Sequence, residues 1–196
     1  MGDNMFKPLK GLNNDQIKKI QLTYPTLKAI QNLTNVPWQA LAGVWYRESF
    51  SIAPPPTPGG SWQFDPVPPS ATLRSWLNKY TDLSVTDKEK RIKTGVNDFE
   101  TGCLFAACLL QHKVKGQLTL NSSDALIKDA LWGYNGRAYG SADNSPYVMN
   151  GYDKEHYPLR LIGTIPDGKG GRIKINNPDL RPGAFVIYKQ LKELFP

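Results

Sequence analysis

Glu48 is the residue of this sequence best placed to move a proton. It lies near the end of an apolar segment with helical periodicity, three residues after Trp45, and a proline-rich segment follows it. Burial against aromatic side chains disfavours a charged carboxylate, so we expect a raised pKa for Glu48. Such a carboxyl group can donate a proton near neutral pH, as the protonation of a glycosidic oxygen requires. The alternative is a surface glutamate or an ion pair with the adjacent Arg47.

Other kinds of chemistry find little support. The only histidines, His112 and His156, lie far apart without further ligands at metal-binding spacing, so we expect no metal site and no cofactor. The glycine-rich segment 168–171 lacks the spacing of a phosphate-binding loop, and no Gly-x-Ser-x-Gly motif occurs. Cys103 and Cys108 are five positions apart in one predicted helix, which turns their side chains away from each other. We therefore expect two unpaired core cysteines.

The composition is that of one globular domain with an anionic partner. The chain has 196 residues, of which 40% are hydrophobic, and a formal charge of +7. Nucleic acid, a membrane surface and a bacterial cell wall are the candidate partners. The basic residues are spread over both halves of the chain, which weakens the nucleic-acid interpretation. There is no apolar run of membrane-spanning length and residues 1–14 are polar, so we expect no membrane insertion and no signal peptide.

Helices must position Glu48. The periodicity predicts a mainly helical domain, α+β in class, with a long proline-rich loop and a small irregular or β-containing part near the C-terminus. Pro25 is expected to divide the first helical segment into two, and Asn35 to cap the helix that carries Glu48, with Pro37 in its first turn. The other expected elements are, in chain order, a loop over 52–70, helices over 73–80 and 97–113, a helix from Ser122 or Ser123 to Gly133–Gly136, a strand over 184–188 and a helical turn over 189–194.

Short motifs in a fixed order resemble those of the lysozyme superfamily, above all the soluble lytic transglycosylases and the goose-type lysozymes. They cover residues 35–149, and their order carries the resemblance because each motif is short. The matching segments are Pro37–Phe50 for the catalytic helix with its terminal Glu-Ser pair, Gly60–Gln63 for a Gly-Leu-Met-Gln type loop, Asp98–Gly102 for an Asn-Ile-x-x-Gly helix start, Gly133–Gly136 for an Ala-Tyr-Asn-Ala-Gly segment, and Tyr147-Val148 for Tyr-Val.

The sequence also departs from the family pattern. Trp62 stands in place of the loop methionine, Gly133 in place of an alanine, and Arg137 in place of a glycine. The proline-rich stretch is unlike the usual loop of the family. Residues 151–196 lie outside the resemblance and form a C-terminal extension to which the sequence assigns no role.

The resemblance implies a role for each matching residue. Glu48 would be the general acid that protonates the oxygen between N-acetylmuramic acid and N-acetylglucosamine, and then the base of the second step. Tyr134 would place its hydroxyl near Glu48. The other residues would line or support the glycan-binding groove: Ser49 as a hydrogen-bond partner of Glu48 or sugar, or as a helix-end cap; Gln63 and Tyr147 as glycan contacts; Trp62 as a stacking surface or a loop anchor; and Asn135 as a structural tie at a helix end.

Two reactions remain open at this point. A lytic transglycosylase needs one carboxyl group, because the muramoyl 6-hydroxyl attacks internally and forms a 1,6-anhydro product, and we favour this reaction. A hydrolase commonly uses a second carboxylate, at about 5 Å from the first or about 6.5 to 9.5 Å away when water lies between them. Asp65 is the acid that the motif loop would bring near Glu48, whereas Asp98 is better explained as a helix N-cap.

A non-catalytic glycan-binding module is the further alternative. In each of these interpretations the partner is the glycan strand of peptidoglycan, with no nucleic acid, and we expect the chain to be a monomer. A cell-wall enzyme without a signal peptide resembles a phage product that reaches the wall with the help of a holin or inside the virion. We therefore expect action on the bacterial cell wall, in the periplasm or outside the cell.

Overall fold

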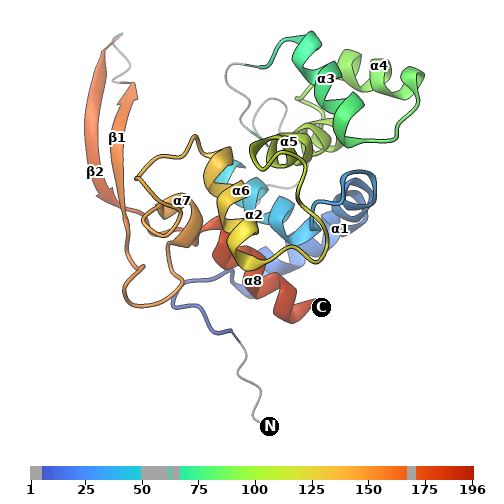
Figure 1. Ribbon diagram of the computed structural model, residues 1–196. Coiled ribbons are helices and arrows are strands. Elements are labelled where there is room, and N and C mark those ends of the chain that lie inside the picture. Colours follow the sequence, from blue (N-terminus) through green and yellow to red (C-terminus); the bar gives the residue numbers. More distant parts are fainter. Residues whose placement is uncertain (1–5, 50–61, 63–66, 167–170) are drawn as a thin grey trace.

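The chain folds mainly into helices, with one small antiparallel sheet near its C-terminus (Figure 1), which confirms the predicted fold class. The computed structural model describes residues 6–49, 62, 67–166 and 171–196. In this part, no helix combines the length and hydropathy that a membrane span requires. The elements are α1 (Asn14–Thr34), α2 (Trp38–Ser49), α3 (Ser70–Tyr80), α4 (Val85–Thr94), α5 (Phe99–Lys113), α6 (Asp124–Tyr134), α7 (Pro146–Met149), β1 (Arg160–Pro166), β2 (Arg172–Pro178) and α8 (Ala184–Leu194).

Helix α2, which carries Glu48, is buried along most of its length. It packs against α1, α5 and α8 at the centre of the structure (Figure 1). The backbones of α2 and α8 approach so closely that a Cβ atom added at Gly43 would lie 2.5 Å from the carbonyl oxygen of Ala184. A side chain at this position would force the two helices apart. The close packing of α2 against its neighbours thus fixes the position of the backbone that carries Glu48.

Helices α5 and α6 begin where the sequence predicts. The side chains of Asp98 and Ser123 each accept a hydrogen bond from a backbone N–H of the first helical turn. Such N-caps satisfy donors that have no partner within the helix. Helix α5 is buried nearly throughout, and its two cysteines, Cys103 and Cys108, are buried and unpaired as predicted.

The first helix corrects two predictions. Pro25 does not divide it, because this proline is exposed and the carbonyl that loses its helical partner belongs to Gln21, which is also exposed. Asn35 does not cap the next helix. It ends α1 in the left-handed conformation, with φ of 57°, and its backbone N–H donates to the carbonyl of Gln31 at 2.8 Å. Helix α2 begins directly after Pro37, whose carbonyl accepts hydrogen bonds from the N–H groups of Ala40 and Leu41.

The strand predicted over 184–188 is wrong, since these residues form the first half of α8. Phenylalanine, valine and isoleucine side chains there favour a strand by propensity, but tertiary packing overrides propensity when a whole face becomes buried. Helix α8 buries this face against α2, α6 and α7. The C-terminal extension is therefore part of the same domain and contributes to the core beneath Glu48.

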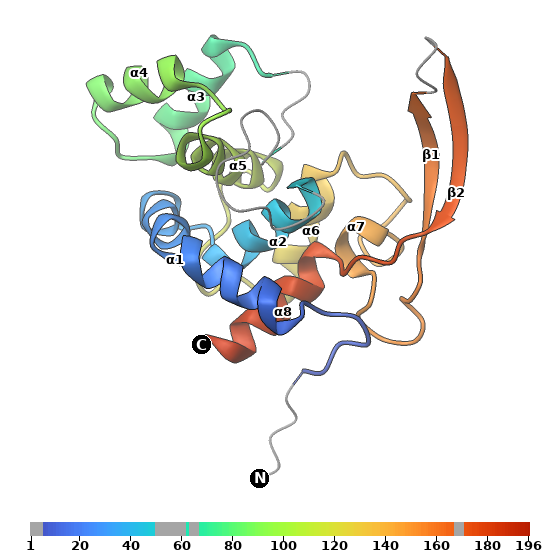
Figure 2. The ribbon, with the colours of Figure 1, turned by 180° about the vertical axis from the view of Figure 1, so that it is seen from behind.

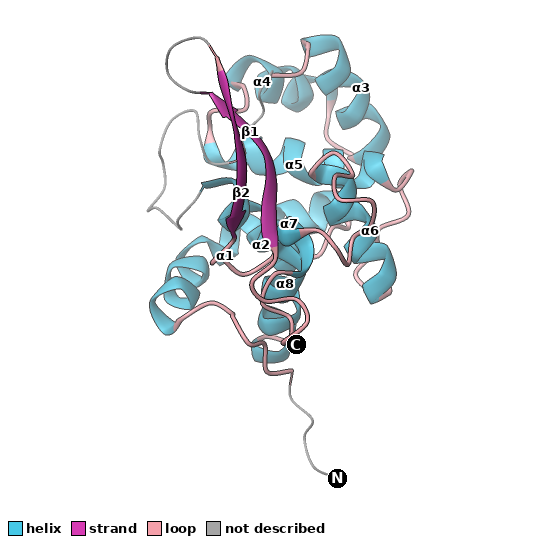
Figure 3. Cartoon of the chain, turned by 90° about the vertical axis from the view of Figure 1, so that its left-hand side faces the viewer, coloured by secondary structure: helices cyan, strands magenta, loops and turns pink. Residues whose placement is uncertain are grey.

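Strands β1 and β2 form a ribbon that stands at one side of the helices (Figure 2) and crosses in front of them in the view onto that side (Figure 3). The antiparallel register pairs Arg160 with Pro178 at the base of the ribbon. The buried side chain of Asn150 fastens this base, because its Oδ1 accepts from the N–H of Leu159 at 2.7 Å and its Nδ2 donates to the carbonyl of Asp179 at 2.7 Å. Both legs of the ribbon are thus tied to the segment that follows α7.

Candidate active site

Glu48 lies in the last turn of α2 and is partly buried. Burial raises the pKa of Glu48 to about 7, because the carboxylate loses hydration that the neutral acid needs less. A hydrogen bond from Tyr147 and the charges of two arginines, Arg47 and Arg181, oppose this rise only in part. The carboxyl group can therefore exchange a proton near neutral pH.

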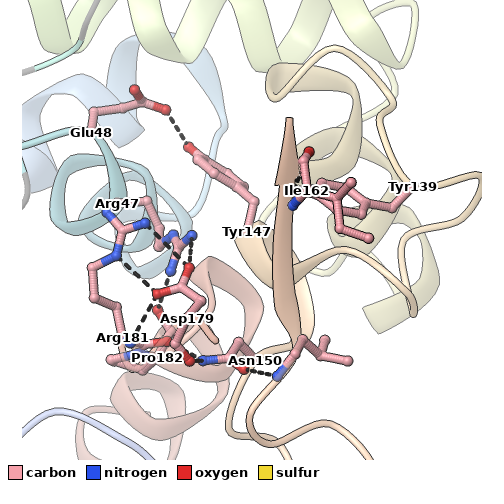
Figure 4. A network of polar contacts seen from close by, with 10 residues as sticks. Arg47, Glu48, Tyr139, Tyr147, Asn150, Ile162, Asp179, Arg181 and Pro182 are labelled. Atoms are coloured by element: carbon pink, nitrogen blue, oxygen red, sulfur yellow. Dashed lines mark hydrogen bonds and ion pairs between the residues drawn. The ribbon is translucent and has the colours of Figure 1, made fainter. Parts of the chain in front are cut away.

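Tyr147, on the short helix α7, is the residue that holds the carboxyl group of Glu48. Its hydroxyl donates to Oε1 of Glu48 at 2.7 Å, and the two side chains point toward each other in Figure 4. The tyrosine is buried, and burial together with the charge of Glu48 raises its pKa well above the ordinary value. The hydroxyl therefore keeps its proton and remains a donor over the whole range in which Glu48 titrates.

Tyr134 lies close enough to Glu48 for the charge of Glu48 to raise its pKa, but its hydroxyl bonds to another residue. Its hydroxyl donates instead to the backbone carbonyl of Trp62 at 3.0 Å. The hydroxyl that bonds to Glu48 is thus that of Tyr147, expected as a glycan contact, while the hydroxyl of Tyr134 bonds to Trp62. Both tyrosines are polar groups on apolar helix faces, and only the folded arrangement shows which one reaches the carboxyl group.

Trp62 is a loop anchor rather than a surface on which a sugar could stack. Its side chain is 1% exposed, its Nε1 donates to the carbonyl of Phe99 at 3.1 Å, and the two rings pack with centroids 5.5 Å apart. A Cβ atom added at Gly102 would lie 2.5 Å from Cδ1 of the tryptophan. The glycine of the Asp98–Gly102 motif therefore has a packing role here, because it makes room for this ring.

The remaining predicted residues are Ser49 and Asn135, which make hydrogen bonds at helix ends, and two residues outside the described part of the chain. The hydroxyl of Ser49 donates to the carbonyl of Trp45 at 2.8 Å, one turn earlier in α2. Asn135 ends α6, and its backbone N–H donates to carbonyls of the last helical turn, as the structural interpretation predicted. Gln63 and Asp65 lie outside the described residues, so the role of Gln63 and the second carboxylate at Asp65 stay predictions.

Arg47 is not the ion partner of Glu48 that the alternative interpretation requires. Its Nη2 lies 2.6 Å from Oδ2 of Asp179, and both side chains are 2% exposed. Consecutive residues of α2 thus serve separate partners: Arg47 pairs with the C-terminal extension and Glu48 with α7. Sequence reasoning missed Asp179, since no spacing relates two residues 132 positions apart.

No family model, no curated protein and no solved structure matches this chain. The function must therefore be argued from the site itself.

Among the described residues, Glu48 is the carboxyl group of the site that is available for proton transfer. Asp179 is committed elsewhere, because its two carboxylate oxygens accept hydrogen bonds from Arg47 and Arg181. Burial alone would raise the pKa of Asp179, but hydrogen bonds and charge from the two arginines outweigh it and lower the pKa. In the described part of the chain, no three histidine, cysteine or acidic side chains are grouped to hold a metal ion. The chemistry within reach is acid and base catalysis by Glu48.

We expect Tyr147→Phe to raise the pKa of Glu48 further, by about one unit, because the lost hydrogen bond favours the charged carboxylate. NMR titration of isotope-labelled glutamate carboxyl groups measures this shift without any substrate. Tyr134→Phe is the matched control, since that hydroxyl bonds to the carbonyl of Trp62 and its loss should leave the titration of Glu48 unchanged. Equal shifts in the two variants would contradict the arrangement.

Proposed function

We propose that this protein cleaves the β-1,4 bond between N-acetylmuramic acid and N-acetylglucosamine in peptidoglycan, as a lytic transglycosylase with Glu48 as its single general acid and base. The observation that carries the proposal is the carboxyl group of Glu48, which is partly buried, accepts a hydrogen bond from Tyr147 and has a pKa raised to about 7. The order of the sequence motifs supports the choice of substrate. The net charge of +7 favours binding to the anionic cell wall.

The proposed reaction has two proton transfers. In the first, protonated Glu48 donates its proton to the bridging oxygen, the bond from this oxygen to C1 of the muramoyl residue breaks, and the N-acetylglucosamine side leaves as an alcohol. In the second, the Glu48 carboxylate takes the proton of the muramoyl 6-hydroxyl while that oxygen bonds to C1. The products are a 1,6-anhydro end and a regenerated acid, and no water is consumed.

Among the described residues, Asp179 is committed to two arginines and is not available as the second carboxylate of a hydrolase, whereas Asp65 lies outside these residues. A hydrolase commonly uses a second carboxylate to activate water or to act as nucleophile. Asp179 cannot take that role while both of its oxygens are occupied.

Mass analysis of the soluble fragments released from purified cell walls tests the proposal. The expected muropeptides are lighter than reducing-end muropeptides by the mass of one water molecule, because the 1,6-anhydro ring replaces the free end. Reducing ends of full mass would contradict the internal attack and identify a hydrolytic muramidase. Walls that release no glycan fragments would contradict glycosidic cleavage altogether.

A further inference from the structure

Asp179 lies between β2 and α8, in the C-terminal extension, and joins two arginines beneath the candidate active site (Figure 4). Its Oδ2 lies 2.6 Å from Nη2 of Arg47, and its Oδ1 lies 3.0 Å from Nε of Arg181. Asp179 and Arg47 are 2% and 4% exposed, so water screens this pair poorly. One buried carboxylate thus faces two guanidinium groups.

Arg47 is a cation whose charge lowers the pKa of Glu48 and so favours loss of its proton. It directly precedes Glu48 in α2, and its guanidinium carbon lies 5.3 Å from the ring centroid of Tyr147, the residue that holds the carboxyl group of Glu48. The buried Nε of Arg47 has no hydrogen-bond partner among the described residues, so the pairing with Asp179 leaves one donor of Arg47 unused. A guanidinium group in direct contact with Glu48 would form an ion pair and keep the carboxylate charged.

We propose that Asp179 is a positioning residue for Glu48: it turns the guanidinium group of Arg47 away from Glu48 and compensates the charges of Arg47 and Arg181, so that Glu48 is left to Tyr147. The catalytic consequence rests on the proposed function, but the electrostatic consequence does not. The inference gives the C-terminal extension a role at the site, although it lies outside the sequence motifs.

The charged and titratable groups around Glu48 come from four parts of the fold. Arg47 belongs to α2, Arg181 to the segment before α8, Tyr147 to α7 and Tyr134 to α6. The tyrosines are neutral wherever Glu48 titrates, because burial raises their pKa values well above the ordinary value. The two arginines already lower the pKa of Glu48, and Asp179 is the carboxylate that both of them touch.

Removal of the negative charge at Asp179 must therefore lower the pKa of Glu48. Asp179→Asn keeps the size of the side chain. It also leaves the backbone ties of residue 179 in place, since these run from its N–H to the carbonyl of Leu159 and from Nδ2 of Asn150 to its own carbonyl. The variant thus changes charge while the base of the β ribbon stays fastened.

The test is an NMR titration of the Glu48 carboxyl group, with the pH profile of cell-wall lysis beside it. We expect Asp179→Asn to lower the pKa of Glu48 by about one unit, which is a tenfold change in the protonated fraction above that pKa. Since the general acid must be protonated, lysis should fall about fivefold at pH 7, about tenfold at higher pH and little at acidic pH. A purely structural defect would lower lysis equally across the pH range.

Two companion variants keep the inference testable if Asp179→Asn folds poorly. Arg47→Met removes the nearest cation while Asp179 keeps Arg181, and it should raise the pKa of Glu48. The double variant Arg47→Met/Asp179→Asn leaves neither charge of the buried pair, and its Glu48 pKa should return toward the wild-type value. Circular dichroism establishes that each variant is folded.

The outcomes separate this inference from the proposed function. A Glu48 titration within about 0.3 units of wild type in Asp179→Asn, or shifts of the same sign in Asp179→Asn and Arg47→Met, would overturn the role of Asp179. A wild-type protein that releases no glycan fragments would overturn the proposed function, while the predicted titration shifts could still be observed.

Discussion

Glu48→Gln is expected to lower the initial rate of muropeptide release from purified cell walls by about a hundredfold to ten-thousandfold, the range that a general acid contributes. Glutamine has nearly the same shape as glutamate, and its amide oxygen can still accept the hydrogen bond from the Tyr147 hydroxyl. The side chain therefore stays in place, but it has no proton to give to the bridging oxygen. The loss should appear in the rate of bond cleavage and not in the amount of protein bound to the wall.

Glu89→Gln provides the matched control for this loss. It makes the same chemical change on α4, where Glu89 pairs with Arg74 at the surface and the side chain is 48% exposed. Lysis should stay within about twofold of wild type, because exposed ion pairs contribute little and this pair lies on another part of the fold. If folded Glu48→Gln protein lysed walls as fast as wild type, Glu48 would not be the acid. If the wild-type protein bound to cell walls but did not lyse them, it would instead be a glycan-binding module.

The helix starts and the core helices follow from the sequence because they depend on neighbouring residues. Asp98 and Ser123 cap helices through contacts three residues away, which a linear sequence displays directly. The errors at Pro25 and over 184–188 have the opposite origin. In both places, local preference argues against a helix, and the helix forms because packing against distant segments buries one of its faces.

The candidate site divides in the same way. The sequence singled out Glu48 and predicted that burial would raise its pKa, because both depend on the apolar helix around it. It could not show that Tyr147 rather than Tyr134 reaches Glu48, because motif order says nothing about which hydroxyl points at the carboxyl group. The pairing of Arg47 with Asp179 was equally hidden, since it joins α2 to a segment that no motif covers.

The second large effect concerns stability: we expect Glu48→Gln, which removes the proposed catalytic carboxyl group, to raise the free energy of unfolding. Glu48 has a pKa of about 7 in the folded protein and an ordinary value of 4.5 when unfolded. Between these values, the unfolded chain releases a proton that the folded protein keeps, so raising the pH favours unfolding. Below the unfolded-state pKa, the ionisation of Glu48 therefore does not change the free energy of unfolding. Above the folded-state pKa, it lowers the free energy of unfolding by about 3 kcal/mol.

Glutamine cannot ionise, so Glu48→Gln should escape this penalty. We expect the variant to exceed wild type in the free energy of unfolding by up to about 3 kcal/mol at about pH 8 and to match it at about pH 4. Urea unfolding at the two pH values measures the difference, and Glu89→Gln should show no comparable gain, since Glu89 is exposed and paired with Arg74. A gain of equal size at both pH values would place its origin in packing rather than in ionisation. A gain confined to alkaline pH would mean that the carboxylate form of Glu48 destabilises the fold. This is the form that must take up a proton before the next bond is cleaved.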